Sequence, residues 1–261
     1  MRKIAGKYYF VYSSVLGHEL CYAVGDAPDG PFTYGGTLVS NGDVGLEGHT
    51  DPKTASNDTG NTHGGMLELD GRLYIFYHRQ TNRHCYARQA CAEQLFPRAD
   101  GSIPQAEITS CGLNGGPLKG EGTYEARIAC NLYSKGGGRF LANIFKARKG
   151  TRPYFTQTGG DRNGDPDQYI ANFCDGATAG FKYFDLRGLK RIGVTLQGSA
   201  EGEVLVQNAL GGEVLCRIPV TGAQTRRTFY APYAGKDGVQ ALFFTFRGTG
   251  KAAFYSISLA R

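Results

Sequence analysis

The sequence contains no tryptophan and no apolar run long enough to form a membrane-spanning helix. It has 261 residues, of which 41% are hydrophobic, and a span requires about 20 consecutive apolar residues. We therefore expect no membrane-spanning helix and no membrane partner. Residues 1–16 carry two early positive charges, as a secretory signal does, but Gly6 and Lys7 interrupt a Tyr-rich stretch. We interpret this segment as a strand.

The cysteines form no metal-binding pattern. None lies in a C-x-x-C pair, and their spacing is wide, which argues against a zinc site. Unpaired cysteines mostly behave as small buried hydrophobes, so we predict reduced thiols and a cytoplasmic location. The seven residues are Cys21, Cys85, Cys91, Cys111, Cys130, Cys174 and Cys216.

Positive charge is not concentrated in any segment. The formal net charge is +6, from 29 basic and 23 acidic residues, and the two kinds are interspersed. Proteins that bind nucleic acid usually gather basic residues into a patch or stripe. We therefore expect no nucleic-acid partner.

Short runs of Tyr, Phe, Val and Ile alternate with Gly, Asn and Asp along the whole chain. Examples are Tyr8–Tyr12, Leu73–Tyr77, Ile192–Leu196 and Leu242–Phe246. Runs of this length and composition are typical of β-strands, and the 39 glycines suit many tight turns. No amphipathic pattern longer than two helical turns is present, so the sequence predicts an all-β protein.

An internal repeat organises the first part of the chain. Residues 1–12 align with residues 66–77 at an offset of 65, and Cys21–Ala23 matches Cys85–Ala87 at an offset of 64. Each copy has the pattern strand, Gly-Lys or Gly-Arg turn, strand, loop, strand. Repeated four-stranded antiparallel sheets are the blades of a β-propeller. The alternative is two unrelated hairpins of similar composition.

Two blades do not close a ring, because propellers typically have four to eight. Either blades are missing or another chain supplies them. The second copy has residues Asn61 to Gly65 leading into Met66. By that comparison, the chain begins inside a blade.

The pattern changes after about residue 113. Gly112–Pro117 is rich in turn residues, Ala126–Cys130 resembles a strand, and strands recur from Tyr154 to Leu259. Such spacing is typical of a jelly-roll β-sandwich. We predict a partial propeller of about two blades over residues 1–113 and a β-sandwich over residues 114–261.

The first part resembles the later blades of glycoside hydrolase family 43. The resemblance rests on the order of six segments: Arg2–Ser14, Glu19–Ala23, Asp29–Tyr34, Gly60–Gly64, Tyr74–Arg79 and Asp100–Pro104. It implies a five-bladed propeller that cleaves arabinofuranosyl or xylosyl linkages with inversion. Residues 114–261 are similar to the family 6 carbohydrate-binding modules that often follow such propellers.

The resemblance also implies which catalytic groups to expect. The family uses an Asp general base, a second Asp and a Glu general acid, because inversion needs two opposed carboxyl groups about 6.5–9.5 Å apart. None of the 23 acidic residues matches these motif positions; the family carboxylates would precede Met1. We therefore predict no catalytic residue. Asp43, Glu47 and Asp51 lie in a loop, where acids are usually solvated.

Part of the remaining machinery has counterparts here. His63 matches the family histidine at the propeller axis, near which a calcium ion is often bound; the alternative is an ordinary turn histidine. Arg88 matches an arginine that holds sugar hydroxyls, for which a planar guanidinium is suited; the alternative is an exposed strand arginine. By the same analogy, His78 and Tyr77 lie near the same cleft.

These observations leave three functional hypotheses. The chain belongs to a glycosidase acting on plant cell-wall oligo- or polysaccharide whose other blades are supplied in trans or lost, it is a non-catalytic carbohydrate-binding protein, or it is a homo-oligomer of half-propellers. Exposed sandwich aromatics are the groups that would stack on a sugar, although aromatics at strand spacing are more often core. The candidates are Tyr154, Tyr169, Tyr183, Tyr230, Tyr233 and Tyr255.

Overall fold

The computed structural model describes residues 1–46, 48–135, 137, 152–160 and 164–261. These residues form strands and two short 3-10 turns, which are the only helical elements in the described ranges. Their contacts divide them into two compact units. The first is formed by Met1–Ile108 together with Gly137, and the second by the other described residues from Thr109 onward. The sequence placed this boundary at residue 113. In the described part of the chain, no helix is long and apolar enough to cross a membrane.

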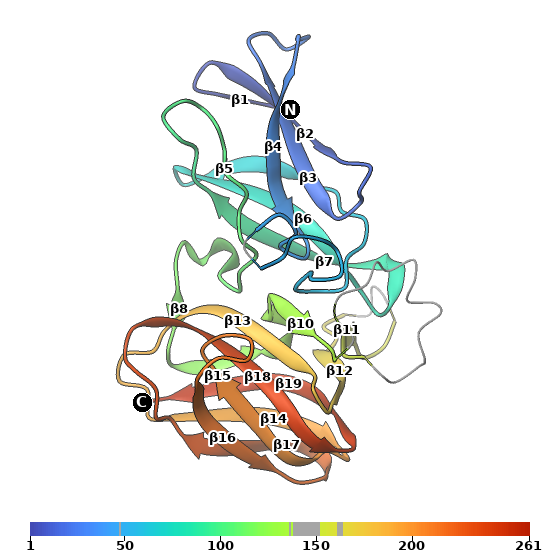
Figure 1. Ribbon diagram of the computed structural model, residues 1–261, viewed down its shortest axis with the longest axis vertical. Coiled ribbons are helices and arrows are strands. Elements are labelled where there is room, and N and C mark those ends of the chain that lie inside the picture. The colour runs from blue at the N-terminus through green and yellow to red at the C-terminus, as the bar shows by residue number, and fades with distance from the viewer. Residues whose placement is uncertain (47, 136, 138–151, 161–163) are drawn as a thin grey trace. The chain divides into compact units, whose positions relative to one another are not determined.

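The first unit contains two antiparallel sheets, coloured blue to green in Figure 1. The first sheet runs in the order β1 (Arg2–Ile4), β2 (Lys7–Ser13), β3 (Glu19–Gly25), β4 (Thr33–Ser40). The second sheet runs in the order β5 (Gly65–Leu69), β6 (Arg72–Thr81), β7 (His84–Leu95).

The internal repeat is reproduced in the register of the first hairpins. Arg2 lies opposite Tyr9 in one sheet and Leu67 lies opposite Tyr74 in the other, both at the offset of 65. The connecting turns also agree, because Ala5 and Asp70 have φ of 46° and 51° and are each followed by a Gly with positive φ. Two positive φ values in succession are the signature of a type I′ hairpin turn.

The third match of the repeat is wrong. Tyr12 lies opposite Cys21, whereas Tyr77 lies opposite Cys91. The structural counterpart of Cys21 is therefore Cys91 and not Cys85. The cause is the longer second hairpin, in which β6 continues to Thr81 before its turn.

The fourth position of the repeat also differs between the copies. In the first copy β4 completes a four-stranded sheet, whereas the second sheet has three strands among the described residues. The segment after β7 pairs instead with the first sheet: Val39 and Ala106 form a parallel bridge, and the Ala106 N–H donates to the Leu38 carbonyl at 2.8 Å.

The second unit is a sandwich of two sheets (Figure 1, lower part). One sheet has the order β10 (Asn131–Tyr133), β13 (Thr178–Asp185), β18 (Val239–Thr249), β15 (Glu201–Gln207), β16 (Val214–Val220), with β8 (Leu118–Lys119) beside β13. The other has the order β11 (Tyr154–Gln157), β12 (Gln168–Cys174), β19 (Lys251–Ala260), β14 (Arg191–Gly198), β17 (Ala223–Pro232), with β9 (Gly122–Glu125) beside β19.

Both sheets of the sandwich bury alternate residues in one hydrophobic core. At its centre, the Phe254 ring lies 5.0 Å from that of Phe173 and 6.0 Å from that of Phe244. One expectation about this unit is wrong, because Ala126–Ile128 is the 3-10 turn η2 and not a strand.

Candidate functional site

Three of the residues singled out in the sequence meet on one face of the second sheet. His78 and Gln80 alternate along β6, and Arg88 lies opposite Gln80 on β7, so their side chains share a face. His63 precedes β5; its backbone N–H donates to Nδ1 of His78 at 3.1 Å, and the two rings are stacked at 5.6 Å.

These contacts determine which ring nitrogen of His78 carries the proton. Because Nδ1 accepts a hydrogen bond, the proton of the neutral ring is on Nε2. Burial lowers the pKa of His78, and the nearby Arg88 and His63 side chains lower it further. Nε2 is buried and has no hydrogen-bond partner among the described residues. The ring is thus neutral at pH 7 and offers one N–H donor.

The surroundings of His63 do not by themselves fit calcium. Its side chain is exposed, and the described residues contain no group of three or more His, Cys, Asp or Glu side chains placed to hold a metal. Calcium prefers six to eight oxygen ligands, whereas His63 would contribute one nitrogen. Calcium at this position stays a prediction.

Tyr77 lies on the opposite face of the same sheet, away from His78 and Arg88. Its hydroxyl donates to Oε1 of Glu93 at 3.2 Å, and burial raises the pKa of Tyr77 well above its ordinary value. The structure therefore does not bring Tyr77 into one cleft with the other two residues. Glu93, which the sequence reasoning missed, is a buried acid opposite Ile75; the alternation along β6 is the signal that could have found it.

The loop acids have separate environments. Asp43 is buried and not solvated as expected, and its Oδ1 accepts a hydrogen bond from the Ile108 N–H at 2.8 Å. Asp51 is exposed, and its Oδ1 accepts a hydrogen bond from the Lys53 N–H at 2.6 Å. Glu47 lies outside the described residues.

In the second unit, an aromatic pair lies on the outward face of the β11–β12–β19–β14–β17 sheet. Tyr169 and Tyr255 alternate with the fully buried Ile170 and Phe254, so they point away from the core. The two rings are 4.9 Å apart and inclined at 33°. The Tyr255 hydroxyl donates to Oε1 of Gln197 at 3.3 Å. We call these two rings the tyrosine platform.

An arginine covers part of the tyrosine platform. The guanidinium carbon of Arg226 lies 3.9 Å from the centre of the Tyr255 ring. Its Nη1 donates to Oδ1 of Asp167 at 3.1 Å, and its Nη2 donates to Oδ2 of the same carboxylate. This contact lowers the pKa of Asp167 and raises that of Arg226. The platform therefore combines flat apolar rings with a charged pair and amide groups at its edge.

The other sandwich tyrosines have different surroundings. Tyr230 is exposed on the same sheet, with the guanidinium of Arg191 at 4.7 Å from its ring centre. Tyr233 donates from its hydroxyl to the Lys236 carbonyl at 2.9 Å. Tyr154 lies on β11 opposite Ala171, and Tyr183 lies on β13 next to the buried Phe184.

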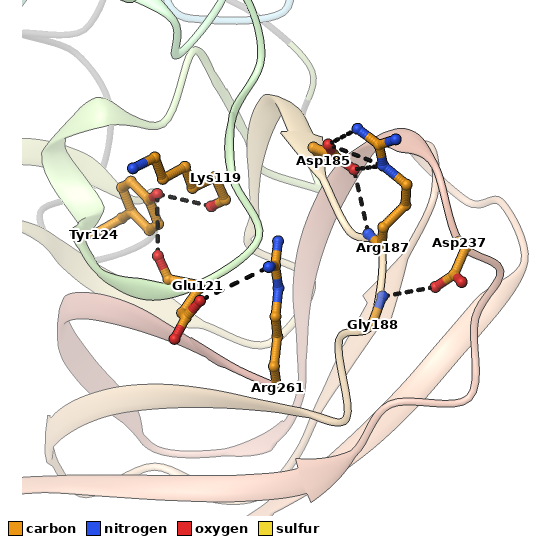
Figure 2. Close-up of polar contacts among 8 residues, drawn as sticks. All are labelled: Lys119, Glu121, Tyr124, Asp185, Arg187, Gly188, Asp237 and Arg261. Carbon is orange, nitrogen blue, oxygen red and sulfur yellow. Dashed lines mark hydrogen bonds and ion pairs between the residues drawn. The ribbon is translucent and has the colours of Figure 1, made fainter.

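Charged groups near the end of β19 form a second polar cluster, which Figure 2 shows. The Arg187 guanidinium binds the Asp185 carboxylate and lowers the pKa of Asp185 to about 2. Asp237 accepts a hydrogen bond from the Gly188 N–H at 3.0 Å, and Arg261 lies 3.9 Å from Glu121. Two of these contacts pair opposite charges, and the third holds the Asp237 carboxylate on a backbone N–H. This indicates a structural role in joining β9, β19 and the turn after β13.

No protein-family model matches the sequence. The chain is 43% identical, over 99% of its length, to a xylosidase/arabinosidase from Thermoclostridium stercorarium, of which it covers 54%. It is 25% identical, over 98% of its length, to an arabinoxylan arabinofuranohydrolase from Bacillus subtilis (strain 168), of which it covers 49%.

A solved structure gives the class of fold. The structure of a glycoside hydrolase family 43 arabinoxylan arabinofuranohydrolase from Bacillus subtilis, in complex with cellotetraose, matches the whole chain with a TM-score of 0.51 at 21% identity, and the match covers 53% of that structure. The fold is that of a family 43 blade-and-sandwich protein. Together with the 43% identity above, this confirms the resemblance to glycoside hydrolase family 43 that the motifs indicated. It spans about half the length of the curated relatives that it matches.

Proposed function

We propose that the chain is the carbohydrate-handling part of a glycosidase that acts on arabinofuranosyl or xylosyl linkages of plant polysaccharides. The observation that carries the proposal is the tyrosine platform, formed by Tyr169 and Tyr255 on the outward face of the sandwich. Paired rings bounded by polar groups are suited to a sugar, which has apolar ring faces and hydroxyls at its edge. The names of the relatives support the choice of an arabinosyl or xylosyl substrate.

The face of the first unit that carries His78 and Arg88 supplies hydrogen-bond donors. The neutral His78 ring offers Nε2–H, and Arg88 offers a planar set of N–H groups. Arg88 is exposed and can donate to hydroxyl or carboxylate oxygens of a sugar, whereas Nε2–H of His78 is buried. Neither can act as the carboxylate pair that hydrolysis with inversion requires.

We further propose that the chain does not hydrolyse glycosides alone. The surroundings of four acidic residues support this view. Glu93 and Asp43 are buried among protein partners, and hydrogen bonding lowers the pKa of Asp167 and Asp185. A general acid needs a raised pKa, so the carboxyl groups of Asp167 and Asp185 are unsuited to that role.

The test measures binding and hydrolysis separately on the purified chain. We expect retardation in an affinity gel containing arabinoxylan, and no release of nitrophenol from p-nitrophenyl arabinofuranoside or xyloside. Binding without hydrolysis also agrees with the second candidate, a non-catalytic binding protein, which the platform favours equally. Hydrolysis by the chain alone would refute its proposed inactivity, and a lack of retardation would refute the carbohydrate-handling role.

A further inference from the structure

The tyrosine platform carries a positive charge on one of its rings. The guanidinium of Arg226, on β17, lies over the ring of Tyr255, with its central carbon 3.9 Å from the ring centre. A planar guanidinium packs well on an aromatic face. A sugar that stacks on this face of Tyr255 must therefore move the guanidinium aside or bind against it.

The same guanidinium holds a carboxylate at the edge of the platform. Its Nη1 and Nη2 donate to the two carboxylate oxygens of Asp167, which is the paired geometry that arginine forms with carboxylates. The backbone of Asp167 is itself fixed. Its N–H donates to Oγ1 of Thr158 at 3.1 Å, and its carbonyl accepts a hydrogen bond from the Thr158 N–H at 2.9 Å. The platform thus has a carboxylate-binding fork beside its rings.

The carboxylate in this fork can be exchanged at little cost. The side chains of Arg226 and Asp167 are 43% and 52% exposed, and ion pairs that are open to water contribute little to stability. When a carboxylate of a ligand takes this place, the Asp167 carboxylate returns to water. A neutral sugar offers only hydroxyl oxygens to the fork, and these form weaker hydrogen bonds with a guanidinium than a carboxylate does. The arrangement therefore favours an acidic sugar over a neutral one.

We propose that Arg226 determines the specificity of the tyrosine platform by binding the carboxylate of a uronic acid in place of Asp167. The ligand carboxylate forms the two hydrogen bonds that Asp167 forms in the structure. As the guanidinium follows that carboxylate, it uncovers the Tyr255 ring, on which the sugar stacks. The inference rests on the proposed function, since the platform must bind sugar, and it adds the class of ligand: a plant polysaccharide that contains uronic acids.

The test is isothermal titration of the intact chain with three ligands of equal length. They are a neutral xylo-oligosaccharide, a xylo-oligosaccharide that carries glucuronic acid, and an oligogalacturonide. We expect at least one acidic ligand to bind about fivefold more tightly than the neutral one, because it adds a charge-assisted pair in an exposed position. The acidic ligand that binds more tightly identifies the polysaccharide.

Variants of the two charged residues separate this contact from sugar stacking. Arg226→Ala should lose the preference for acidic ligands and bind the neutral ligand at least as tightly as the wild type, because the Tyr255 ring is uncovered. Asp167→Asn should bind the acidic ligand about threefold more tightly, because the competing carboxylate is removed. Arg191→Ala is the matched control: Arg191 belongs to the same sheet and lies over Tyr230 at 4.7 Å, so its removal should leave the preference unchanged.

Three results would overturn the proposal. Equal affinity of the wild type for neutral and acidic ligands would refute it and leave the carbohydrate-handling role intact, whereas no binding of any ligand would refute both. Equal loss of preference in Arg191→Ala and Arg226→Ala would show that general positive charge, and not the fork, attracts the ligand. Arg226→Lys keeps the charge but lacks the fork, so it should also lose most of the preference, and it repeats the test should Arg226→Ala fail to fold.

Discussion

Replacing Tyr255 by alanine tests the tyrosine platform most directly. The ring stands outward between Tyr169 and Arg226, and no core residue depends on it, because its neighbour Phe254 faces the other way. We therefore expect Tyr255→Ala to fold normally and to bind arabinoxylan more weakly.

The size of the effect follows from the surface that is lost. A sugar ring on the platform would cover roughly 60 Å² of apolar ring surface, worth about 25 cal/mol per Å², or about 1.5 kcal/mol. That corresponds to roughly a tenfold rise in Kd. Tyr255→Phe keeps the ring and loses the hydroxyl with its hydrogen bond to Gln197, so its Kd should stay within about threefold of the wild-type value.

Tyr230 provides the matched control. It is exposed on the same sheet and also has an arginine over its ring, but among the described residues no second tyrosine ring pairs with it. We expect Tyr230→Ala to bind like the wild type in isothermal titration with soluble arabinoxylan oligosaccharides. Unchanged binding by Tyr255→Ala, or equal losses in both alanine variants, would refute the reasoning.

Two further predictions concern the stability of the sandwich. Phe254→Ala removes a fully buried ring from the core and should lower the free energy of unfolding by about 3–5 kcal/mol, measured by urea titration; a loss below about 1 kcal/mol would contradict the packing described. The pKa of Asp185, held at about 2 by Arg187, lies below its ordinary value, so its stabilising contribution is complete above about pH 4 and is lost as pH falls through 2. The melting temperature of Asp185→Asn should therefore be lower than that of the wild type at pH 6, and most of this difference should be lost at pH 2, where the Asp185 carboxyl group is half protonated. A difference at pH 2 as large as that at pH 6 would contradict this assignment.

The sequence predicted the strands and the repeat well, because both rest on local signals. The alternation of Tyr8 to Tyr12 and the turn residues before them fix a hairpin through neighbouring residues alone. The third match of the repeat failed because hairpin length depends on where the chain turns. The similar residues at Cys21 and Cys85 could not reveal that β6 extends further before its turn than β2 does.

The site was predicted in part, for a similar reason. Residues two apart on a strand share a face, so His78 and Tyr77, which are adjacent, could not both point into one cleft. Asp43 is buried where it accepts a hydrogen bond from the Ile108 N–H, and Ile108 is 65 residues away in the sequence. Local sequence signals could not reveal this contact. The pairing of Tyr169 with Tyr255 likewise depends on β12 lying beside β19, which strand spacing alone does not determine.

The segment that follows β7 has a consequence for the integrity of the first unit. It forms hydrogen bonds with the Leu38 carbonyl and with Asp43. It thereby covers the free edge of β4, whose backbone groups could otherwise pair with another chain. Unshielded strand margins promote aggregation. We therefore expect proteolytic cleavage between residues 96 and 101, after the second sheet, to expose the edge of β4 in the first sheet. The cleaved protein should precipitate although none of its strands is cut.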